Sequence, residues 1–264
     1  MFSWVLVTIL GLGLTQQSTT LLSIEEIQKQ LTSELLGKVL TLRAFNKSSH
    51  VEFDETGQLK KQGEPGSWTV YSQLLVKKID VTASRVHISG VRVIHHYDPK
   101  AKGLVASPSD MNLDVDIYIK KAADISAAFS KIFAGNEGLL PYVPSYWHQY
   151  LSGKKDETPP PNPSNVSQRV RVGGNIMGAK LIKQVVPKYS VEAKNFLLEG
   201  VVALSVEINE TGNVENINIV GPAGAGFDEN AVEAVSQWKY SPTLLDGKPV
   251  RVLTTITVNY KFSR

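Results

Sequence analysis

The chain has 264 residues, 42% hydrophobic and 20% charged, with a formal net charge of +3, values that are ordinary for a globular protein of one or two domains. Its 28 basic residues are interleaved with 25 acidic ones, which argues against the concentrated basic surface of a nucleic-acid-binding protein. The absence of cysteine excludes disulfides, thiol catalysis and cysteine-based zinc sites.

An uncharged apolar run, Trp4–Leu14, lies near the N-terminus and is followed by polar residues from Thr15 to Thr20. A membrane-spanning helix needs about 20 apolar residues, whereas the apolar core of a signal peptide has about 7 to 15. We therefore predict that residues 1–20 are a cleaved export signal and that the mature protein is periplasmic. An uncleaved anchor in the inner membrane is the main alternative, and a buried N-terminal helix is a second one.

Residues 21–151 combine helical and extended patterns. Ser23-Ile24-Glu25-Glu26 is a capping box that opens a helix with apolar residues at helical spacing. The period then changes to two, which predicts a mostly-β domain, an antiparallel meander or a small partly closed barrel, with flanking helices. The segments predicted as extended are 38–45, His50–Phe53, Trp68–Tyr71, Leu74–Val81, Arg85–Tyr97 and Met111–Ile119, and a helix is expected over Ala122–Phe133.

The histidines of this first domain raise the question of a metal site. His95, His96 and Asp98 are near one another, and His50 and Asp54 lie elsewhere in the same domain. Adjacent residues of a strand point to opposite faces, so His95 and His96 do not readily share one metal ion. This pattern favours surface or strand-end histidines.

Two carboxylates, Asp114 and Asp116, share one face of a predicted strand, as a catalytic pair would. The solvent-facing side of such a strand is usually polar, so we expect both to be solvated. No serine of the chain lies in a Gly-x-Ser-x-Gly motif, and no glycine-rich loop has the spacing that binds phosphate. We therefore predict no enzymatic activity, no cofactor and no metal, with a ligand-binding barrel or a metal enzyme in this domain as alternatives.

A change of composition marks the segment Ser152–Gln168, which contains Thr158-Pro159-Pro160-Pro161-Asn162-Pro163. Consecutive prolines hold an extended polyproline chain that has no packed core. We predict that residues 152–168 are a linker and that a second domain occupies residues 169–264.

The second domain begins with a short helix and a hairpin. Ser190 is placed to cap a helix over Val191–Leu198. Gly200–Ile208 and Val214–Gly221 are predicted as paired strands, and Gly212 supplies the positive φ angle that closes their turn.

The rest of this domain predicts a helix and a final strand. Asp228 is expected to cap the helix, whose apolar stripe ends at Trp238. The final segment, Val250–Phe262, has a period of two that is typical of a strand. Its two alternating sets are Val252, Thr254, Ile256, Val258, Tyr260 and Phe262, and Arg251, Leu253, Thr255, Thr257, Asn259 and Lys261. The expected fold class is α+β, with a three-stranded antiparallel sheet and two helices on one face in this domain.

Four short motifs occur in order in the second domain. They are Pro187-Lys188-Tyr189-Ser190, Gly200-Val201-Val202-Ala203-Leu204, Trp238-Lys239-Tyr240-Ser241-Pro242 and Gly247-Lys248-Pro249-Val250. Together with the order of elements over Arg169–Phe262, they resemble the C-terminal domain of TonB-family proteins. The resemblance implies that this domain binds an extended segment of an outer-membrane receptor, the TonB box, by adding it as a strand to the sheet.

The resemblance also implies that the final strand is the receptive edge and acts mainly through its backbone. Within the entry motif, Pro187 and Tyr189 are expected near the peptide, whereas Trp238 and Tyr240 are expected to pack in the core. The expected contact residues of the edge are Thr254, Thr255, Ile256, Thr257, Val258, Asn259 and Tyr260.

The chain departs from the energy-transducing members of that family. Its apolar run is short and lacks histidine, and a folded domain precedes a short linker. Ser190 stands where the family usually has proline, and Val186 stands where some members have glutamine. We therefore expect an envelope protein-interaction module without a nucleic-acid partner. The alternative is a membrane-anchored energy transducer that engages inner-membrane motor proteins.

Overall fold

The computed structural model describes residues 23–153, 170–171 and 179–262, and the chain divides into two compact units. The first contains the described residues up to His95 together with Ala106–Tyr142, and the second contains His96–Val105 and the described residues from Val143 onward. The predicted export signal and most of the predicted linker lie outside the described residues. Within the described part, no helix has both the length and the hydropathy needed to cross a membrane.

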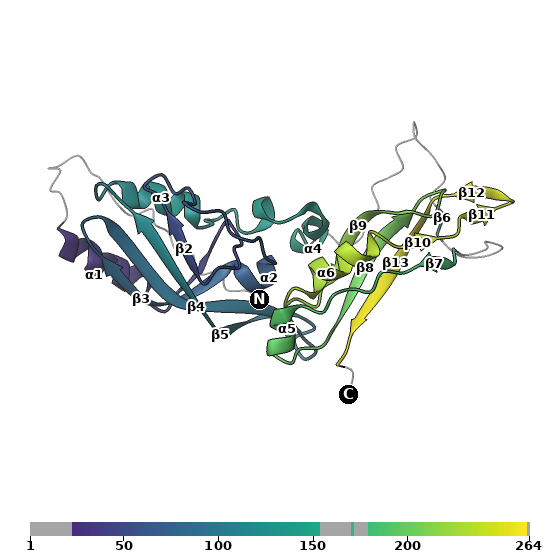
Figure 1. The fold of residues 1–264 in the computed structure, drawn as a ribbon, viewed down its shortest axis with the longest axis horizontal. Helices are drawn as coiled ribbons and strands as arrows, with labels where there is room; N and C mark the ends of the chain where they lie inside the picture. The colour runs from purple at the N-terminus through teal and green to yellow at the C-terminus, as the bar shows by residue number, and fades with distance from the viewer. Residues whose placement is uncertain (1–22, 154–169, 172–178, 263–264) are drawn as a thin grey trace. The chain divides into compact units, whose positions relative to one another are not determined.

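The first unit is built on a five-stranded sheet with the strand order β1-β3-β4-β5-β2 (Figure 1). Strands β3, β4 and β5 follow one another as a meander, and β2 pairs in parallel with β5. The predicted meander is thus present in β3, β4 and β5, and β1 and β2 join its two sides out of chain order. The strands are β1 (Val39–Thr41), β2 (His50–Phe53), β3 (Gln73–Val81), β4 (Arg85–Asp98) and β5 (Gly103–Tyr118).

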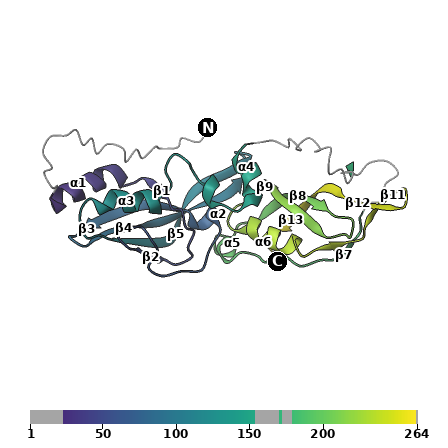
Figure 2. The same cartoon turned by 90° about the horizontal axis from the view of Figure 1, so that it is seen from above.

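Two helices, α1 (Ile24–Leu35) and α3 (Asp124–Ile132), cover one face of this sheet (Figure 2). The predicted capping box opens α1: the backbone N–H of Ser23 donates to Glu26 at 2.7 Å, and the N–H of Glu26 donates to Ser23 Oγ at 3.2 Å. Apolar side chains of both helices and of every strand form one buried cluster. Since successive strand residues point to opposite faces, the residues between these apolar positions lie on the other side of the sheet.

One predicted strand is a helix. Trp68–Tyr71 forms the short helix α2, in which all four side chains are buried. The Oγ atom of Ser67 accepts from the backbone N–H of Thr69 at 3.2 Å and caps its first turn. The aromatic and β-branched residues favour a strand, but the serine cap and the burial of all four side chains outweigh that preference.

The second unit has a four-stranded sheet in the order β6-β13-β8-β9. Strand β8 is antiparallel to both β9 and β13, which gives the predicted three-stranded antiparallel sheet, and β6 adds a short parallel strand to β13. Gly212 has a φ of 82° in the turn between β8 and β9, as expected. These strands are β6 (Val170–Arg171), β8 (Gly200–Ile208), β9 (Val214–Gly221) and β13 (Val252–Tyr260).

Smaller elements complete the second unit. Helix α6 (Phe227–Val235) packs on β8 and β9 through buried side chains such as Ala231. Two small two-stranded sheets join β7 to β10 and β11 to β12. The remaining short elements are η1 (Leu140–Tyr142), which belongs to the first unit, and η2 (Ser145–Trp147), α4 (His148–Leu151), β7 (Leu181–Lys183), α5 (Val191–Asn195), β10 (Lys239–Tyr240), β11 (Thr243–Leu245) and β12 (Lys248–Val250).

Asp228 does not cap α6 in the expected way. The helix begins one residue earlier, at Phe227, after Gly226 with a φ of 77°. The carboxylate of Asp228 instead accepts from the backbone N–H groups of Ala223 at 2.9 Å and Gly224 at 2.7 Å. The glycine-rich loop can adopt the left-handed conformation that starts the helix early, so the aspartate holds the loop rather than the helix end.

Candidate functional site: the edge of strand β13

Strand β13 is paired unequally on its two sides. On one side it pairs with β8 along its whole length, from Val252 opposite Ile208 to Tyr260 opposite Gly200. On the other side β6 pairs only with Val252 and Leu253. Among the described strands, none pairs with the second side of Thr254–Tyr260. This stretch is therefore an edge strand that presents backbone donors and acceptors.

The side chains of this edge alternate between core and solvent. Ile256, Val258 and Tyr260 are buried, whereas Thr255, Thr257 and Asn259 are exposed. The buried residues fix the strand on the core, and the exposed ones are small and polar. An incoming strand would therefore meet mainly backbone. All seven predicted contact residues, Thr254–Tyr260, lie in this one edge, and their contact with a partner stays a prediction.

Strand β9, at the opposite edge of the sheet, is contacted by other elements of the second unit. Elements η2 and α4 lie against β9. The backbone N–H of Tyr97 donates to the carbonyl of Ala223, in the loop that follows β9, at 2.9 Å. Strand β9 therefore has described neighbours at its outer side, whereas the described pairing on the outer side of β13 is that of β6 with Val252 and Leu253.

The predicted entry residue Tyr189 lies beside the C-terminal end of β13. Its ring is 5.1 Å from that of Phe227, 5.7 Å from that of Tyr260 and 5.2 Å from that of Phe262, between centroids. Its hydroxyl donates to the carbonyl of Leu198. Burial raises the pKa of Tyr189, which keeps the hydroxyl protonated as a donor. Tyr189 thus helps to fix the end of the edge strand through an aromatic cluster.

The rest of the entry segment is held by Trp238 and Ser190. The indole N–H of Trp238 donates to the carbonyl of Val185 at 2.8 Å, and the residue is 8% exposed, which confirms its expected core position. Ser190 accepts from the N–H of Ala193 at 3.0 Å, so it caps α5 as predicted. Pro187 is half-buried between these anchors, and no described contact joins it to the edge of β13.

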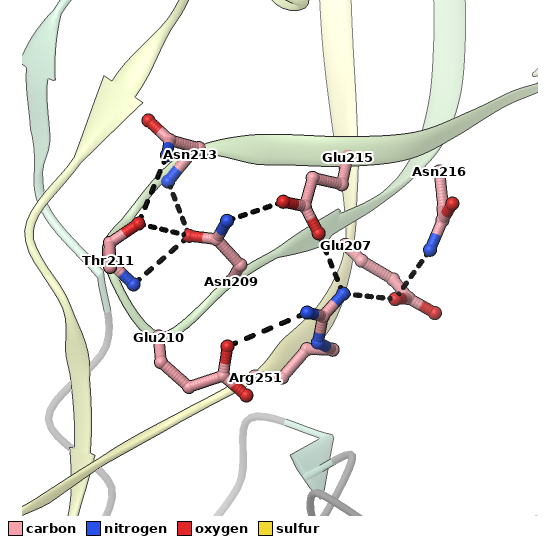
Figure 3. Close-up of polar contacts among 8 residues, drawn as sticks. All are labelled: Glu207, Asn209, Glu210, Thr211, Asn213, Glu215, Asn216 and Arg251. Atoms are coloured by element: carbon pink, nitrogen blue, oxygen red, sulfur yellow. Dashed lines mark hydrogen bonds and ion pairs between the residues drawn. The ribbon is translucent and has the colours of Figure 1, made fainter. Parts of the chain in front are cut away.

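A charged network that the sequence analysis missed ties the start of β13 to the hairpin β8–β9 (Figure 3). Arg251 Nη1 is 2.8 Å from Glu215 and 3.2 Å from Glu207, and Nη2 is 3.6 Å from Glu210. Glu207 is only 4% exposed and also accepts from Asn216 Nδ2 at 2.9 Å. The signal in the sequence is weak: an arginine precedes the last strand, and a glutamate interrupts the apolar end of β8.

The hairpin turn carries the other half of this network (Figure 3). Asn209 Oδ1 accepts from the backbone N–H groups of Thr211 at 3.0 Å and Asn213 at 2.9 Å, and its Nδ2 donates to Glu215. Because Glu215 also bonds Arg251, the turn and the first residues of β13 form one hydrogen-bonded unit. This network fixes the N-terminal end of the edge strand, as the aromatic cluster fixes its other end.

The histidines considered from the sequence are not brought together. His95 Nε2 is 2.9 Å from Gln73 Oε1 in the first unit. His96 forms a backbone bridge with Gly224 in the second unit. The carboxylate of Asp98 accepts a backbone N–H in the turn that follows β4. The part of the chain that the structure describes therefore offers no joint site of His95, His96 and Asp98.

Asp116 was expected to be solvated and is buried instead. Its side chain is 4% exposed, although it shares the outer sheet face with Asp114 as predicted. The side chains of His50, His87 and Arg85 from the neighbouring strands cover it. Strand alternation shows which face a residue occupies, but not whether its neighbours cover it.

The comparisons with known proteins concern the second unit. Residues 185–262 match the family described as Gram-negative bacterial TonB protein C-terminal. Over 79 residues the chain is 34% identical to Protein TonB of Vibrio cholerae serotype O1 (strain ATCC 39315 / El Tor Inaba N16961), a match that covers 30% of this chain and 32% of that protein. The chain thus spans about a third of the length of this curated relative.

Among solved structures, the solution NMR structure of the Pseudomonas aeruginosa TonB CTD is similar at 20% sequence identity and a TM-score of 0.28. That match covers 37% of this chain and 97% of the other. The family match and the curated relative agree with the order of motifs from Pro187 to Val250. Residues 185–262 of this chain are therefore a C-terminal domain of the TonB family.

Proposed function

We propose that the second unit binds an extended peptide of an outer-membrane receptor, or of another envelope partner, by β-strand addition along Thr254–Tyr260. The observation that carries this proposal is that no strand of the described ranges pairs with the second side of that stretch. A peptide laid along it gains a ladder of backbone hydrogen bonds, which gives affinity with little demand on the peptide's sequence. On this proposal the unit acts by binding and catalyses no chemical step.

The length of the edge sets the footprint of the peptide. Since β6 already pairs with Val252 and Leu253, the added strand begins opposite Thr254. At about 3.4 Å per residue, the stretch to Tyr260 accepts a strand of roughly 24 Å. At its far end, the 37% exposed ring of Phe262 offers apolar surface, and an apolar peptide residue there would gain affinity through burial.

The family of the C-terminal domain favours a periplasmic location, with residues 1–20 as an export signal. A membrane-anchored energy transducer is the second candidate, and the two differ in the N-terminus of the mature chain. A mature chain that begins near Gln16–Leu21, measured by mass spectrometry of the protein purified from its envelope fraction, would exclude the anchored form. A chain that retains Trp4–Leu14 in the membrane fraction would favour it.

The absence of native cysteine permits a direct test of the edge. Single cysteines are placed at the exposed positions Thr255, Thr257 and Asn259 of the full chain, and disulfide formation with cysteine-bearing receptor peptides is followed by mass spectrometry. Rapid pairing is expected, with the favoured peptide position shifting by two residues between successive sites, since one side of a strand repeats every second residue. Gln237→Cys, exposed at the end of α6, is the control. Equal rates at Gln237 and at the strand sites would contradict the proposal.

A further inference from the structure

A buried carboxylate lies between two histidines on the face of the first unit's sheet that is opposite the core. His50 Nε2 in β2 is 2.9 Å from Asp116 Oδ2, and His87 Nδ1 in β4 is 2.7 Å from Asp116 Oδ1. Asp116 belongs to β5, which lies between these two strands. His50 and His87 therefore each bond a different oxygen of the same buried carboxylate.

The strand register adds a second carboxylate. Strand β2 runs parallel to β5 with Glu52 opposite Asp116 and His50 opposite Asp114, so Glu52 projects on the same face as His50. A nitrogen of His50 and carboxylate oxygens of Glu52 and Asp116 all lie within 4.8 Å of one another. Over the described ranges, this is the group of histidine and acidic side chains whose spacing suits a metal ion.

We propose that His50, Glu52 and Asp116 bind a divalent transition-metal ion of the zinc type, with His87 as a positioning residue that holds Asp116. Imidazole nitrogen and carboxylate oxygen are ligands that zinc accepts, whereas magnesium and calcium favour sites made of oxygen alone. The chain has no cysteine, and these ligands include none. It lies in the first unit and is independent of the peptide-binding edge.

The geometry requires an adjustment of the side chains. Zinc–ligand bonds of about 2.1 Å place two ligands of a tetrahedral site about 3.4 Å apart, whereas His50 Nε2 is 2.9 Å from Asp116 Oδ2 and the three ligand atoms lie within 4.8 Å of one another. Rotation of His50, whose side chain is 50% exposed, and of the half-buried Glu52 can bring the ligand atoms to zinc distances. Asp116, in contrast, is fixed by its burial and provides the rigid ligand.

Neighbouring residues hold the ligands in place. The hydroxyl of Tyr118 donates to Glu52 Oε1 at 2.7 Å, and His87 Nδ1 is hydrogen-bonded to Asp116 Oδ1 at 2.7 Å. Hydrogen bonds of this kind orient ligands in metal sites and raise their affinity. Tyr118 comes from β5, the strand that carries Asp116, and His87 comes from the neighbouring β4.

The charge balance favours a cation at this point. Glu52, Asp114 and Asp116 face the cluster. Its described neighbouring cations include Arg85, whose Nη1 is 3.4 Å from Asp116 Oδ2, and Lys60, whose Nζ is 3.7 Å from the ring centroid of Tyr118. Burial opposes the ionisation of Asp116, but hydrogen bonds from His87 and His50 and the charge of Arg85 hold its pKa below the ordinary value. Arg85 is 41% exposed, so it can move away, and its charge opposes a bound metal ion by repulsion.

The test is calorimetric titration of the tag-free, chelator-treated full chain with zinc chloride. We expect one zinc ion per chain, with weaker binding at pH 5.5 than at pH 7.5, because protons compete for the imidazoles. His50→Gln and His87→Gln should each weaken binding at least about tenfold, whereas Arg85→Met should tighten it. Magnesium chloride should produce no such binding.

His148→Gln is the matched control, because His148 is an exposed histidine whose ring contacts only a backbone carbonyl, that of Val143 at 3.2 Å. Circular dichroism melts verify that each variant is folded. The proposal is overturned if the wild-type chain binds no zinc, or if both His50→Gln and His87→Gln bind it with unchanged affinity. In the second case, zinc is held by surface groups other than this cluster.

Discussion

Arg251, the residue immediately before β13, is 3.2 Å through Nη1 from the carboxylate of the buried Glu207 in β8. Removing one partner of a buried ion pair leaves a charge without compensation and costs about 3 kcal/mol or more. We therefore expect Arg251→Met to lower the free energy of unfolding of the second unit by about 3 kcal/mol. Urea unfolding followed by tryptophan fluorescence, to which the buried Trp147 and Trp238 of the second unit contribute, measures this change.

The control for this prediction is Glu210→Gln. Glu210 is 3.6 Å from Arg251 and its side chain is 36% exposed, so its loss should cost less than about 1 kcal/mol. If Arg251→Met unfolds at the same urea concentration as the wild type, Glu207 is compensated by other groups and the network in Figure 3 does not stabilise the edge strand.

Local signals predicted the elements that depend on a few adjacent residues. The capping box at Ser23 opens α1, Gly212 closes the hairpin with positive φ, and the alternation of Val250–Phe262 gives β13. The start of α6 was misjudged because the preceding glycine-rich loop, and not Asp228, provides the first turn. Sequence patterns thus identify a helix or strand more reliably than they identify the residue at which it begins.

The polar clusters could not be predicted in the same way, because they depend on which strands become neighbours. His50 and His87 are 66 and 29 residues from Asp116 in sequence. Their meeting requires β2 to insert beside β5 in parallel, which no local pattern specifies. The edge of β13 was predictable because a family resemblance supplied the topology that the residues alone do not.

Ser190, which replaces the family's usual proline, makes two buried hydrogen bonds. It caps α5 by accepting from Ala193 and donates to the carbonyl of Ala225 at 2.7 Å. Ser190→Ala should therefore destabilise the second unit by about 1 to 2 kcal/mol, measured by thermal or urea unfolding. The exposed Ser236 at the end of α6 is the control, and Ser236→Ala should change stability by less than about 0.5 kcal/mol. Similar effects of the two changes would contradict the role of the Ser190 cap.

Arg92 is a buried cation in the first unit, and a lysine at this position should destabilise that unit. Its guanidinium donates to the carbonyls of Tyr71, Asn46 and Ser48 at 2.7 to 3.0 Å, and it is 1% exposed. Burial lowers the pKa of Arg92 to about 10, so it stays charged at neutral pH. The sequence analysis did not single out Arg92, which shares the inward face of β4 with Ile88.

Replacing this side chain removes a fork that a single ammonium group cannot reproduce. Arg92→Lys should lower the free energy of unfolding of the first unit by about 2 to 3 kcal/mol, because at least one buried carbonyl loses its donor. Arg85→Lys is the control, since Arg85 is 41% exposed, and should cost less than about 1 kcal/mol. Equal stability of the Arg92→Lys chain and the wild type would show that the three carbonyls find other donors.

The backbone of the edge at Thr254–Tyr260 makes the sharpest prediction about the partner. Successive N–H groups of an added strand point alternately toward the sheet and toward solvent. N-methylation of a bound heptapeptide at every second residue should therefore abolish binding in one set of positions and be tolerated in the other. A side-chain-driven contact would show no such alternation. Chemical-shift changes along β13 of the full chain, recorded with each methylated peptide, measure the effect.

Proline at Thr255 or Thr257, which removes a backbone donor from the strand and distorts its edge, should weaken binding of the unmodified peptide. Proline at the exposed Gln62, in a loop of the first unit, should leave binding unchanged, and a peptide that binds all these chains equally well would place the site elsewhere.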